Sequence, residues 1–403
     1  MNRCVKCGAC SVVCPVYQVS GRETHTARGK HHLMEVMGHG EIGPFYETLF
    51  SQCLLCGRCN EVCRREIDTP LAVVRARAGF SACYGEHGYQ KFLARKILEH
   101  PSLLHGLTSL GGRVAERLGR VLPAESGLRL KLGLLRPDDE GSGHSQPAPD
   151  PAPLLPAPKG PTLIYYPGCV STYLYPSIAD GSCSLVSRGG CHAVIPEGLG
   201  CCGLAAWAAG DLAGAKRLAR QNIEVLERLQ GEIVVSCGSC WYQLRRYGRL
   251  FEDPAWQERG QRLAERVVML SRFLARHPVL QEGQRWQGGK KTRVFYHDPC
   301  HLLHEERLVD APREVLARLP GVEIVELEGG SRCCGHGGLF SLGAPELSEA
   351  IRERLISAIL QLRPDWITTS CSGCLMQLRM GVEQAGSRVK VLDLSELLCK
   401  LSG

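Results

Sequence analysis

The sequence predicts a chain of mixed α+β and α/β class, in which one small helical domain precedes two repeated α/β domains with parallel sheets. Three observations lead to this prediction. Cysteine is abundant, with 22 among 403 residues, and most of it falls into short repeated motifs. A segment rich in proline and glycine, residues 136–161, divides the chain. Beyond it, one order of apolar runs, helical stretches and cysteines occurs twice.

The length and composition indicate a globular protein of two or three domains. A chain of 403 residues is longer than one hydrophobic core usually supports. Its 44% hydrophobic and 22% charged residues are typical of folded proteins. We see no run of about 18 uncharged apolar residues, and the N-terminal segment MNRCVKCGAC lacks the apolar core of a signal peptide. We therefore expect a cytoplasmic protein, and we leave open peripheral attachment to the inner face of the cytoplasmic membrane.

The cysteine content indicates metal or redox chemistry rather than structural disulfides, because the chain is not small and carries no export signal. The formal net charge of +7 could suggest nucleic acid. No basic tract is interleaved with aromatic residues, however. Two bound [4Fe–4S] clusters, at about −2 each with their thiolates, would also lower the charge to about +3. We expect no nucleic-acid partner.

Two runs near the N-terminus share one cysteine spacing. Residues 4–15 read CVKCGACSVVCP and residues 53–64 read CLLCGRCNEVCR, both C-x₂-C-x₂-C-x₃-C, which is the spacing of bacterial ferredoxins. The first three thiolates of a run can reach three iron corners of one cubane, whereas the fourth lies too far along the chain and completes the other cluster. We therefore predict two [4Fe–4S] clusters, one bound by Cys4, Cys7, Cys10 and Cys63 and the other by Cys53, Cys56, Cys59 and Cys14.

Structural zinc is the alternative for these runs, but zinc usually takes four ligands from two cysteine pairs. Two complete four-cysteine runs favour clusters, although Arg64 stands where the second run would carry proline. The segment TARGKHHLMEVM between the runs and residues 91–135 have helical periodicity. The later helices either pack on the ferredoxin module or form a surface that docks a partner or a membrane face. We place the ferredoxin domain at 1–135 and the linker at 136–161.

The second half of the chain contains two units, predicted as domains 162–289 and 290–403. The first contains TLIYYPGCV, GLGCCG and VVSCGSC, and the second TRVFYHDPC, SRCCG and TTSCSGC. Each unit supplies five cysteines in the order C…CC…C-x₂-C, so we call the units CCG domains. Their candidate metal ligands are Cys169, Cys201, Cys202, Cys237 and Cys240 in the first, and Cys300, Cys333, Cys334, Cys371 and Cys374 in the second.

Each cysteine motif follows a short β-rich run, and helical stretches such as GAKRLARQNIEVLERL lie between the runs. This alternation predicts a parallel sheet, in which the cysteines converge at the carboxyl ends of the strands. A helix is expected after each C-x₂-C, where its dipole stabilises thiolates. The glycine after each vicinal pair lets the backbone turn. Five thiols exceed the four that a cubane needs, so we expect one or two further iron–sulfur clusters, non-cubane in form.

Other interpretations of the CCG cysteines are structural zinc and a redox disulfide between the vicinal pair. GLGCCG also matches the dinucleotide pattern G-x-G-x-x-G, but the second unit lacks this match, so we treat it as coincidence. Four cysteines lie outside every motif and are expected to be ordinary buried residues: Cys83, Cys183, Cys191 and Cys399.

Four histidines lie close in sequence to the second set of CCG cysteines: His297, His301, His304 and His336. One interpretation is structural, with the rings donating hydrogen bonds around the site. The other is proton delivery to a substrate or quinone. On the second interpretation, the candidate catalytic residues are His297, His301 and His336.

The eight-cysteine ferredoxin region followed by two CCG domains resembles the iron–sulfur subunit of glycolate oxidase and related D-lactate dehydrogenases. It is also similar to the catalytic subunit of membrane-linked heterodisulfide reductase. The likeness covers nearly the whole chain and includes the stretches YHDPCHLLH, CCGHGGLFSL and SGCLMQLRMG. The presence of both Cys237 and Cys371 corresponds to the fuller heterodisulfide reductase pattern.

The resemblance implies an oxidoreductase subunit that transfers electrons through iron–sulfur clusters. A partner subunit with FAD would oxidise a 2-hydroxy acid, glycolate or D-lactate, and the electrons would pass through this chain to a quinone, a cytochrome, a membrane subunit or another carrier. The sequence shows no flavin motif, which agrees with a flavin on the partner. The alternative is a heterodisulfide reductase-like catalytic subunit that reduces a disulfide at a CCG-bound cluster. A third hypothesis is an interaction protein whose CCG domains bind zinc.

Overall fold

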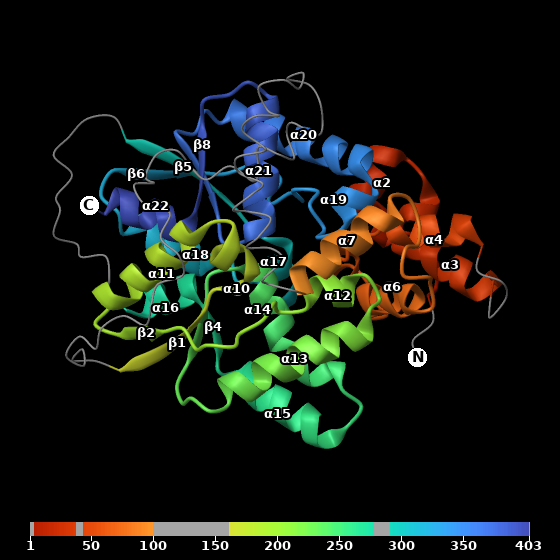
Figure 1. Ribbon diagram of the computed structural model, residues 1–403. Coiled ribbons are helices and arrows are strands. Elements are labelled where there is room, and N and C mark those ends of the chain that lie inside the picture. Colours follow the sequence, from red (N-terminus) through yellow and green to blue (C-terminus); the bar gives the residue numbers. More distant parts are fainter. Residues whose placement is uncertain (1–3, 38–42, 100–160, 278–290, 403) are drawn as a thin grey trace, which may run out of the picture.

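The two CCG domains form two four-stranded sheets, in which every neighbouring pair of strands is parallel. The computed structural model describes residues 4–37, 43–99, 161–277 and 291–402 (Figure 1). The predicted linker, apart from its last residue, and residues 100–135 of the predicted helical segment lie outside the described residues. The two sheets confirm the predicted parallel α/β repeats.

The first sheet has the strand order β2-β1-β3-β4. Its strands are β1 (Thr162–Tyr166), β2 (His192–Val194), β3 (Ile233–Val235) and β4 (Val267–Met269). The helices of this domain are α10 (Gly168–Tyr173), α11 (Pro176–Arg188), α12 (Leu204–Ala208), α13 (Leu212–Leu226), α14 (Gly238–Arg245), η2 (Tyr247–Leu250), α15 (Pro254–Glu265) and α16 (Leu270–Arg276). All three residues of β3 are buried, because helices cover both faces of a parallel sheet.

The second sheet repeats this order as β6-β5-β7-β8. Its strands are β5 (Thr292–His297), β6 (Val322–Val325), β7 (Trp366–Thr369) and β8 (Lys390–Asp393). Its helices are α17 (Cys300–Glu306), α18 (Asp310–Ala317), α19 (Phe340–Gly343), α20 (Pro345–Gln361), α21 (Ser372–Gln384) and α22 (Leu394–Leu401). Helix α11 of the first domain packs against α22 of the second, and α16 packs against α18. The two repeats therefore share one hydrophobic core.

The N-terminal domain is helical and packs against helices of both CCG domains (Figure 1). It consists of α1 (Ala9–Val13), α2 (Pro15–Ser20), η1 (Glu23–His25), α3 (Ala27–Met37), α4 (Pro44–Ser51), α5 (Arg58–Glu61), α6 (Thr69–Ala78) and α7 (Gly88–Glu99). Helices α1 and α5 begin at corresponding positions of the two cysteine runs, directly after Gly8 and Gly57. They pack against each other. The predicted helix in TARGKHHLMEVM is α3. Among the described residues, no helix combines the length and apolar character that crossing a bilayer requires.

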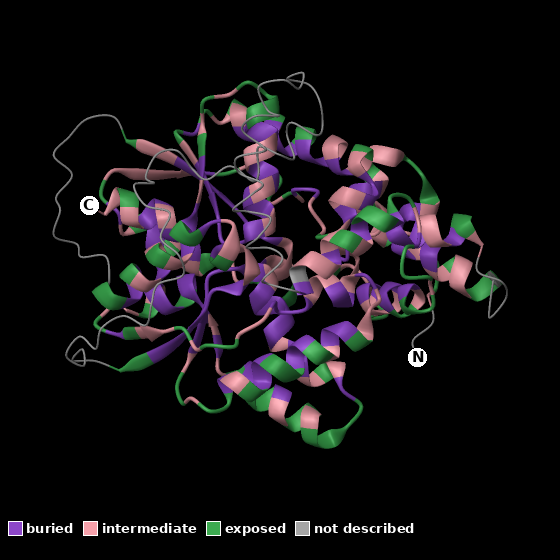
Figure 2. Ribbon diagram, viewed as in Figure 1, coloured by how far each residue is buried: buried purple, intermediate pink, exposed green. Residues whose placement is uncertain are grey.

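Two buried arginines hold the three domains together. The Arg77 guanidinium of α6 donates hydrogen bonds to the carbonyl oxygens of Phe50 and Cys53 in its own domain and to that of Ala208 in the first CCG domain. The Arg246 guanidinium, just after α14, pairs with carboxylates of both other domains. These are Asp68 at 3.5 Å and Glu305 at 2.9 Å. Figure 2 shows that the buried residues of the sheets continue into the helical domain.

The contact between α6 and the first CCG domain leads to a prediction about Gly210. This residue has φ +84°, and a Cβ on it would lie 2.5 Å from the Ala78 nitrogen at the end of α6. We expect Gly210→Ala to lower the free energy of unfolding by roughly 3 kcal/mol, from left-handed strain and backbone collision together. The matched control is Gly190→Ala, because Gly190 has φ +75° but no atom near its Cβ position.

The control should lose only roughly 1 kcal/mol. Thermal or denaturant unfolding of the anaerobically purified variants measures both values. An equal loss of unfolding free energy in the two variants would show that the close approach of α6 to Gly210 does not add to the cost of the substitution.

Candidate metal centres

The motif cysteines lie in four groups, which we name by their domains. The outer ferredoxin group is Cys4, Cys7, Cys10 and Cys63, and the inner ferredoxin group is Cys14, Cys53, Cys56 and Cys59. The first CCG group is Cys169, Cys201, Cys202, Cys237 and Cys240. The second CCG group is Cys300, Cys333, Cys334, Cys371 and Cys374. The structure brings together the members of the inner ferredoxin group and of both CCG groups, and it brings together Cys4, Cys7 and Cys10 of the outer ferredoxin group.

The outer ferredoxin group lies at the protein surface. Cys7 is exposed. Burial raises the pKa of Cys10, and the negative charges of Cys4 and Cys7 raise it further, so these three thiols are neighbours. The backbone N–H of Arg28 donates to the Cys10 sulfur at 3.4 Å. Cys63 follows α5, which packs on α1, the helix that carries Cys10.

The inner ferredoxin group lines a single cavity to which both runs contribute. Burial, together with the charge of Cys53, raises the pKa of Cys14. Cys14 in turn contributes to the raised pKa values of Cys56 and Cys59. Cys14 therefore lies among the first three cysteines of the other run. This arrangement supports the crossed assignment of ligands, which stays a prediction.

A buried lysine on α3 accompanies the inner ferredoxin group. Lys30 is fully buried and lines the same cavity, and its ammonium donates to the His25 carbonyl oxygen at 2.6 Å. Burial lowers the pKa of Lys30, whereas the negative charges of Cys53 and Cys14 act in the opposite direction. Burial and the Lys30 charge lower the pKa of His25 to about 4, so the imidazole is neutral at pH 7. An ammonium here would offset negative charge on bound sulfur. The sequence offered no signal for Lys30 beyond its place in the predicted helix.

In the first CCG group, all five thiols converge at the carboxyl ends of β1 and β3, as predicted. Hydrogen bonds from the Cys169 and Cys202 thiols hold the pKa of Cys201 well below its usual range. Cys240 does the same for Cys237. Cys237 is the N-cap of α14, so the dipole of this helix points at the group. The left-handed φ of Gly203, +84°, turns the chain away from the vicinal pair.

The second CCG group repeats this arrangement and adds a histidine. The sulfur atoms of Cys334 and Cys374 lie 3.3 Å apart. Hydrogen bonds from Cys333 and Cys374 lower the pKa of Cys334. His297, at the end of β5, has a ring nitrogen within 4.8 Å of the sulfurs of Cys334 and Cys374. In the first domain Tyr166 ends the equivalent strand, and its hydroxyl donates to the Gly200 carbonyl oxygen at 2.7 Å.

The other candidate histidines occupy three different environments. His301 is stacked on Tyr242 with ring centroids 4.4 Å apart, and burial lowers its pKa to about 4. Burial also lowers the pKa of His336, which packs against α21 close to Gly373. His304 lies across the domain boundary, with its Nδ1 atom 2.9 Å from a Glu61 carboxylate oxygen. Of the four, only His297 belongs to a described cluster of metal-ligating atoms.

The inner ferredoxin group, the second CCG group and the first CCG group contact one another in turn across the domain boundaries, which the sequence did not predict. Cys56 of the inner ferredoxin group contributes to the raised pKa of Cys333 in the second CCG group, and Cys300 contributes to that of Cys56. These three cysteines line one small cavity between the domains. The second CCG group meets the first where the Cys371 thiol donates to Cys237. The backbone N–H of Gly238 beside it donates to the Ser370 carbonyl oxygen at 2.7 Å.

The donor sets fit iron–sulfur clusters. Thiolate is a soft ligand that selects iron–sulfur clusters, zinc or copper(I). In each CCG group, hydrogen bonds between buried thiols lower the pKa of one sulfur, Cys201 or Cys334, and raise that of its neighbour, Cys202 or Cys374. A metal that binds thiolates would displace the protons of these thiols. Four cysteines around one cavity match the ligand count of a cubane. At the second CCG group, two cysteines and His297 also form part of a set that zinc accepts.

The four cysteines outside the motifs differ in burial, although all four were expected to be buried. Cys191 is buried, and Cys183 and Cys399 are half-buried, with the Cys399 thiol donating to the Gly181 carbonyl oxygen at 3.5 Å. The prediction of burial was wrong for Cys83, which is exposed. It lies in a turn between α6 and α7.

Comparisons with known proteins agree with this organisation. Residues 1–67 match the family described as 4Fe-4S dicluster domain. Residues 163–245 and 294–379 both match the family described as Cysteine-rich domain, named CCG. Each CCG match ends before the last strand of its sheet but contains all five cysteines of its group.

Curated relatives match the whole chain or a part of it. The probable glycolate oxidase iron-sulfur subunit of Bacillus subtilis is 28% identical over 99% of this chain and 94% of its own length. Lactate utilization protein A of Halalkalibacterium halodurans is 31% identical over 57% of this chain and 93% of its own. A subunit of the CoM/CoB fumarate reductase of Methanothermobacter marburgensis is 26% identical over 99% of this chain and 72% of its own. With its dicluster ferredoxin domain and paired cysteine groups, this chain belongs to the family of iron–sulfur oxidoreductase subunits that includes the glycolate oxidase and lactate utilization proteins.

Proposed function

We propose that this chain is the electron-transfer subunit of a flavin-dependent 2-hydroxy-acid dehydrogenase. A partner FAD subunit would oxidise glycolate or D-lactate, and this chain would pass the electrons to a quinone or another carrier. The observation that carries the proposal is the succession of cysteine groups, in which the inner ferredoxin group contacts the second CCG group and the second CCG group contacts the first. Bound iron–sulfur clusters would supply one-electron transfer at these groups.

The outer ferredoxin group supports a protein partner at one end of the series. Its Cys7 is exposed, and two apolar residues of the same run, Val5 and Val12, are 64% and 75% exposed. Exposed apolar side chains beside a redox group suit a surface that another protein covers. We therefore propose that the flavin subunit docks at this run.

The described part of the chain also favours a flavin on another subunit. GLGCCG, whose glycine spacing resembles a dinucleotide-binding loop, contributes both of its cysteines to the first CCG group. Its vicinal thiols point into that group, so the segment is not available to hold a pyrophosphate. A quinone acceptor would place the protein at the inner face of the cytoplasmic membrane, as a peripheral protein.

A second candidate function rests on the meeting of the two CCG groups. Cys237 and Cys371 face each other across the domain boundary, and the Ser239 hydroxyl lies 3.2 Å from the Cys371 sulfur. Two sulfur-rich groups in contact favour a heterodisulfide reductase-like activity, in which a disulfide is reduced at a CCG group. His297, His301 and His336 stay candidate proton donors for it. An assay of the purified chain with disulfide substrates distinguishes this activity from electron transfer alone.

The crossed ligand assignment can be tested with three cysteine variants. We expect Cys14→Ser to remove the same EPR signal as Cys56→Ser, because both residues line the inner cavity. Cys7→Ser should remove the other ferredoxin signal. Each variant should lose roughly four of eight ferredoxin irons. Cys83→Ser, at an exposed cysteine outside the motifs, is the control and should retain both signals. A Cys14→Ser spectrum that matches Cys7→Ser would contradict the crossing.

The metal content of the CCG groups provides a second test. The full chain, reconstituted anaerobically, should hold more than roughly eight irons, the content of two cubanes. Cys334→Ser should remove the excess and leave both ferredoxin signals, because its sulfur lies at the centre of the second CCG group. Cys183→Ser, at a half-buried cysteine outside the groups, should keep the full content. Iron no higher than two cubanes, or zinc in its place, would overturn the cluster assignment.

The need for a flavin partner gives a third prediction. The purified chain, free of flavin, should reduce no dye with glycolate or D-lactate, because none of its described groups accepts a hydride. Addition of the flavin subunit should start dye reduction, which absorbance measures directly. Dye reduction by the flavin-free chain alone, with glycolate or D-lactate as substrate, would contradict the proposal that a separate flavin subunit oxidises the hydroxy acid.

A further inference from the structure

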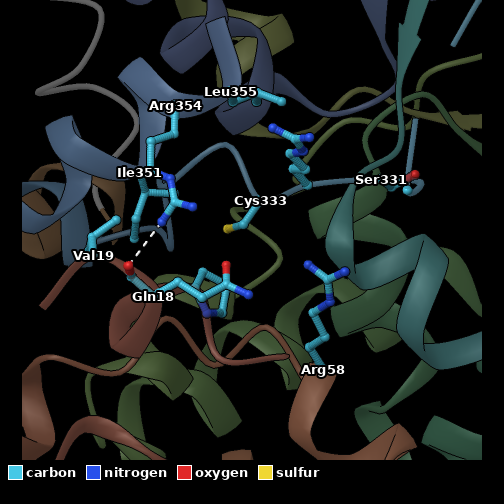
Figure 3. Close-up of a pocket in the computed structure, with 11 residues that line it drawn as sticks. Gln18, Val19, Arg58, Ser331, Cys333, Ile351, Arg354 and Leu355 are labelled. Atoms are coloured by element: carbon cyan, nitrogen blue, oxygen red, sulfur yellow. Dashed lines mark hydrogen bonds between the residues drawn. The ribbon is translucent and has the colours of Figure 1, made fainter. Parts of the chain in front are cut away.

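A hollow of about 370 Å³ lies between the ferredoxin domain and the second CCG domain. One side is formed by α2 and by the start of α5, and the other by the loop that leads to Cys333 and by α20. Figure 3 shows Arg58 and Arg354 on opposite sides of this space, with Cys333 between them. Its volume lies in the range of small-molecule sites.

The hollow is strongly cationic. Arg58, Arg332 and Arg354 line it, and none of its described lining residues is acidic. In the described part of the chain, Arg58 and Arg332 form no ion pair, while Arg354 donates only to the Gln18 carbonyl oxygen, at 2.9 Å. The nearby carboxylate of Asp298 is already held by Arg313, at 2.8 and 2.9 Å, and by the Ser331 hydroxyl.

Three arginines from three separate elements repel one another unless an anion lies between them. A guanidinium binds a carboxylate through two parallel hydrogen bonds, which makes arginine the preferred partner of this group. Because Arg58 and Arg354 are on opposite sides, a single carboxylate would satisfy only one of them. Between the arginines, the wall is apolar at Val19, Ile351 and Leu355, which suits a short hydrocarbon chain.

The position of Cys333 connects the hollow to the redox groups. Its side chain lines the hollow, while its backbone neighbour Cys334 lies at the centre of the second CCG group. Cys333 also lies near Cys56 of the inner ferredoxin group. A molecule in the hollow would thus lie beside the point where these two groups meet.

We propose that this hollow binds a small organic dicarboxylate. Each carboxylate pairs with arginines on one side, and the bound anion adds negative charge next to Cys333. A reduction that adds an electron beside this anion becomes less favourable, so the reduction potential of a redox centre held by Cys333 falls when the dicarboxylate binds. By linkage, reduction weakens the binding of the dicarboxylate to the same degree. The binding itself does not depend on the proposed function.

Calorimetry on the anaerobically purified full chain tests the binding, with succinate and malonate as probes and sulfate as the competing anion. We expect one saturable site per chain and binding weaker by roughly tenfold or more in Arg332→Gln, because a charged hydrogen-bonding partner is lost. Arg332 is preferred to Arg354, which also contacts α2 through Gln18. Arg228→Gln, an exposed arginine in the first CCG domain, is the matched control and should bind like the unmodified chain.

An EPR-monitored redox titration provides the second readout. Succinate should lower the midpoint potential of the signal that Cys333→Ser abolishes, and should leave it unchanged in Arg332→Gln. Binding without any such signal would support the hollow while overturning the proposed clusters of the second CCG group. Absence of saturable binding, equal binding of sulfate, or equal affinity in Arg332→Gln would each overturn the proposal, since the arginines would then only balance the charge of the cysteine groups.

Discussion

The crowding of sulfur atoms away from water is the constraint on which the rest of this structure depends. A buried thiolate is costly by itself, and neighbouring thiolates repel each other. The fold relieves this cost locally. Cys201 and Cys334 accept hydrogen bonds from adjacent thiols, and the helices that begin after Cys237 and Cys371 point their positive ends at the groups. Burial lowers the pKa of Lys30, and the negative charges of Cys53 and Cys14 in the inner ferredoxin group oppose this by stabilising the Lys30 ammonium.

The same constraint explains how the three domains pack. Cysteines of different groups meet at domain boundaries, so separation of the domains would expose thiols to water and break their shared hydrogen bonds. The buried charges of Arg77 and Arg246 also bond across these boundaries, and a buried charge that loses its partners is strongly destabilising. The arrangement of the domains and the order of the cysteine groups are therefore one property of the fold.

The sequence predicted what covalent spacing determines, and missed what depends on the packing of separate elements. Cysteine spacing and alternating apolar runs predicted the ferredoxin runs, the two parallel sheets and the convergence of each CCG group. No local pattern relates Cys56 to Cys300 or Cys237 to Cys371, because these contacts depend on how finished domains dock. The burial of Lys30 was missed because it depends on how helices pack within the ferredoxin domain, and a lysine on a short amphipathic helix usually faces water. The exposed Cys83 shows that composition alone does not predict burial.

The two CCG groups share a motif but occupy unequal positions. The second group contacts both the inner ferredoxin group and the first CCG group, and it carries His297 and the arginine-lined hollow beside it. The first group has Tyr166 in place of the histidine, and the contact between Cys237 and Cys371 joins it to the second. The duplicated motif therefore has two different surroundings: the second CCG group contacts two other groups, and the first CCG group contacts one. In the first CCG group, Cys169 is the one cysteine that is not fully buried. This most accessible cysteine of the first CCG group lies in α10, on a different domain from the exposed Cys7.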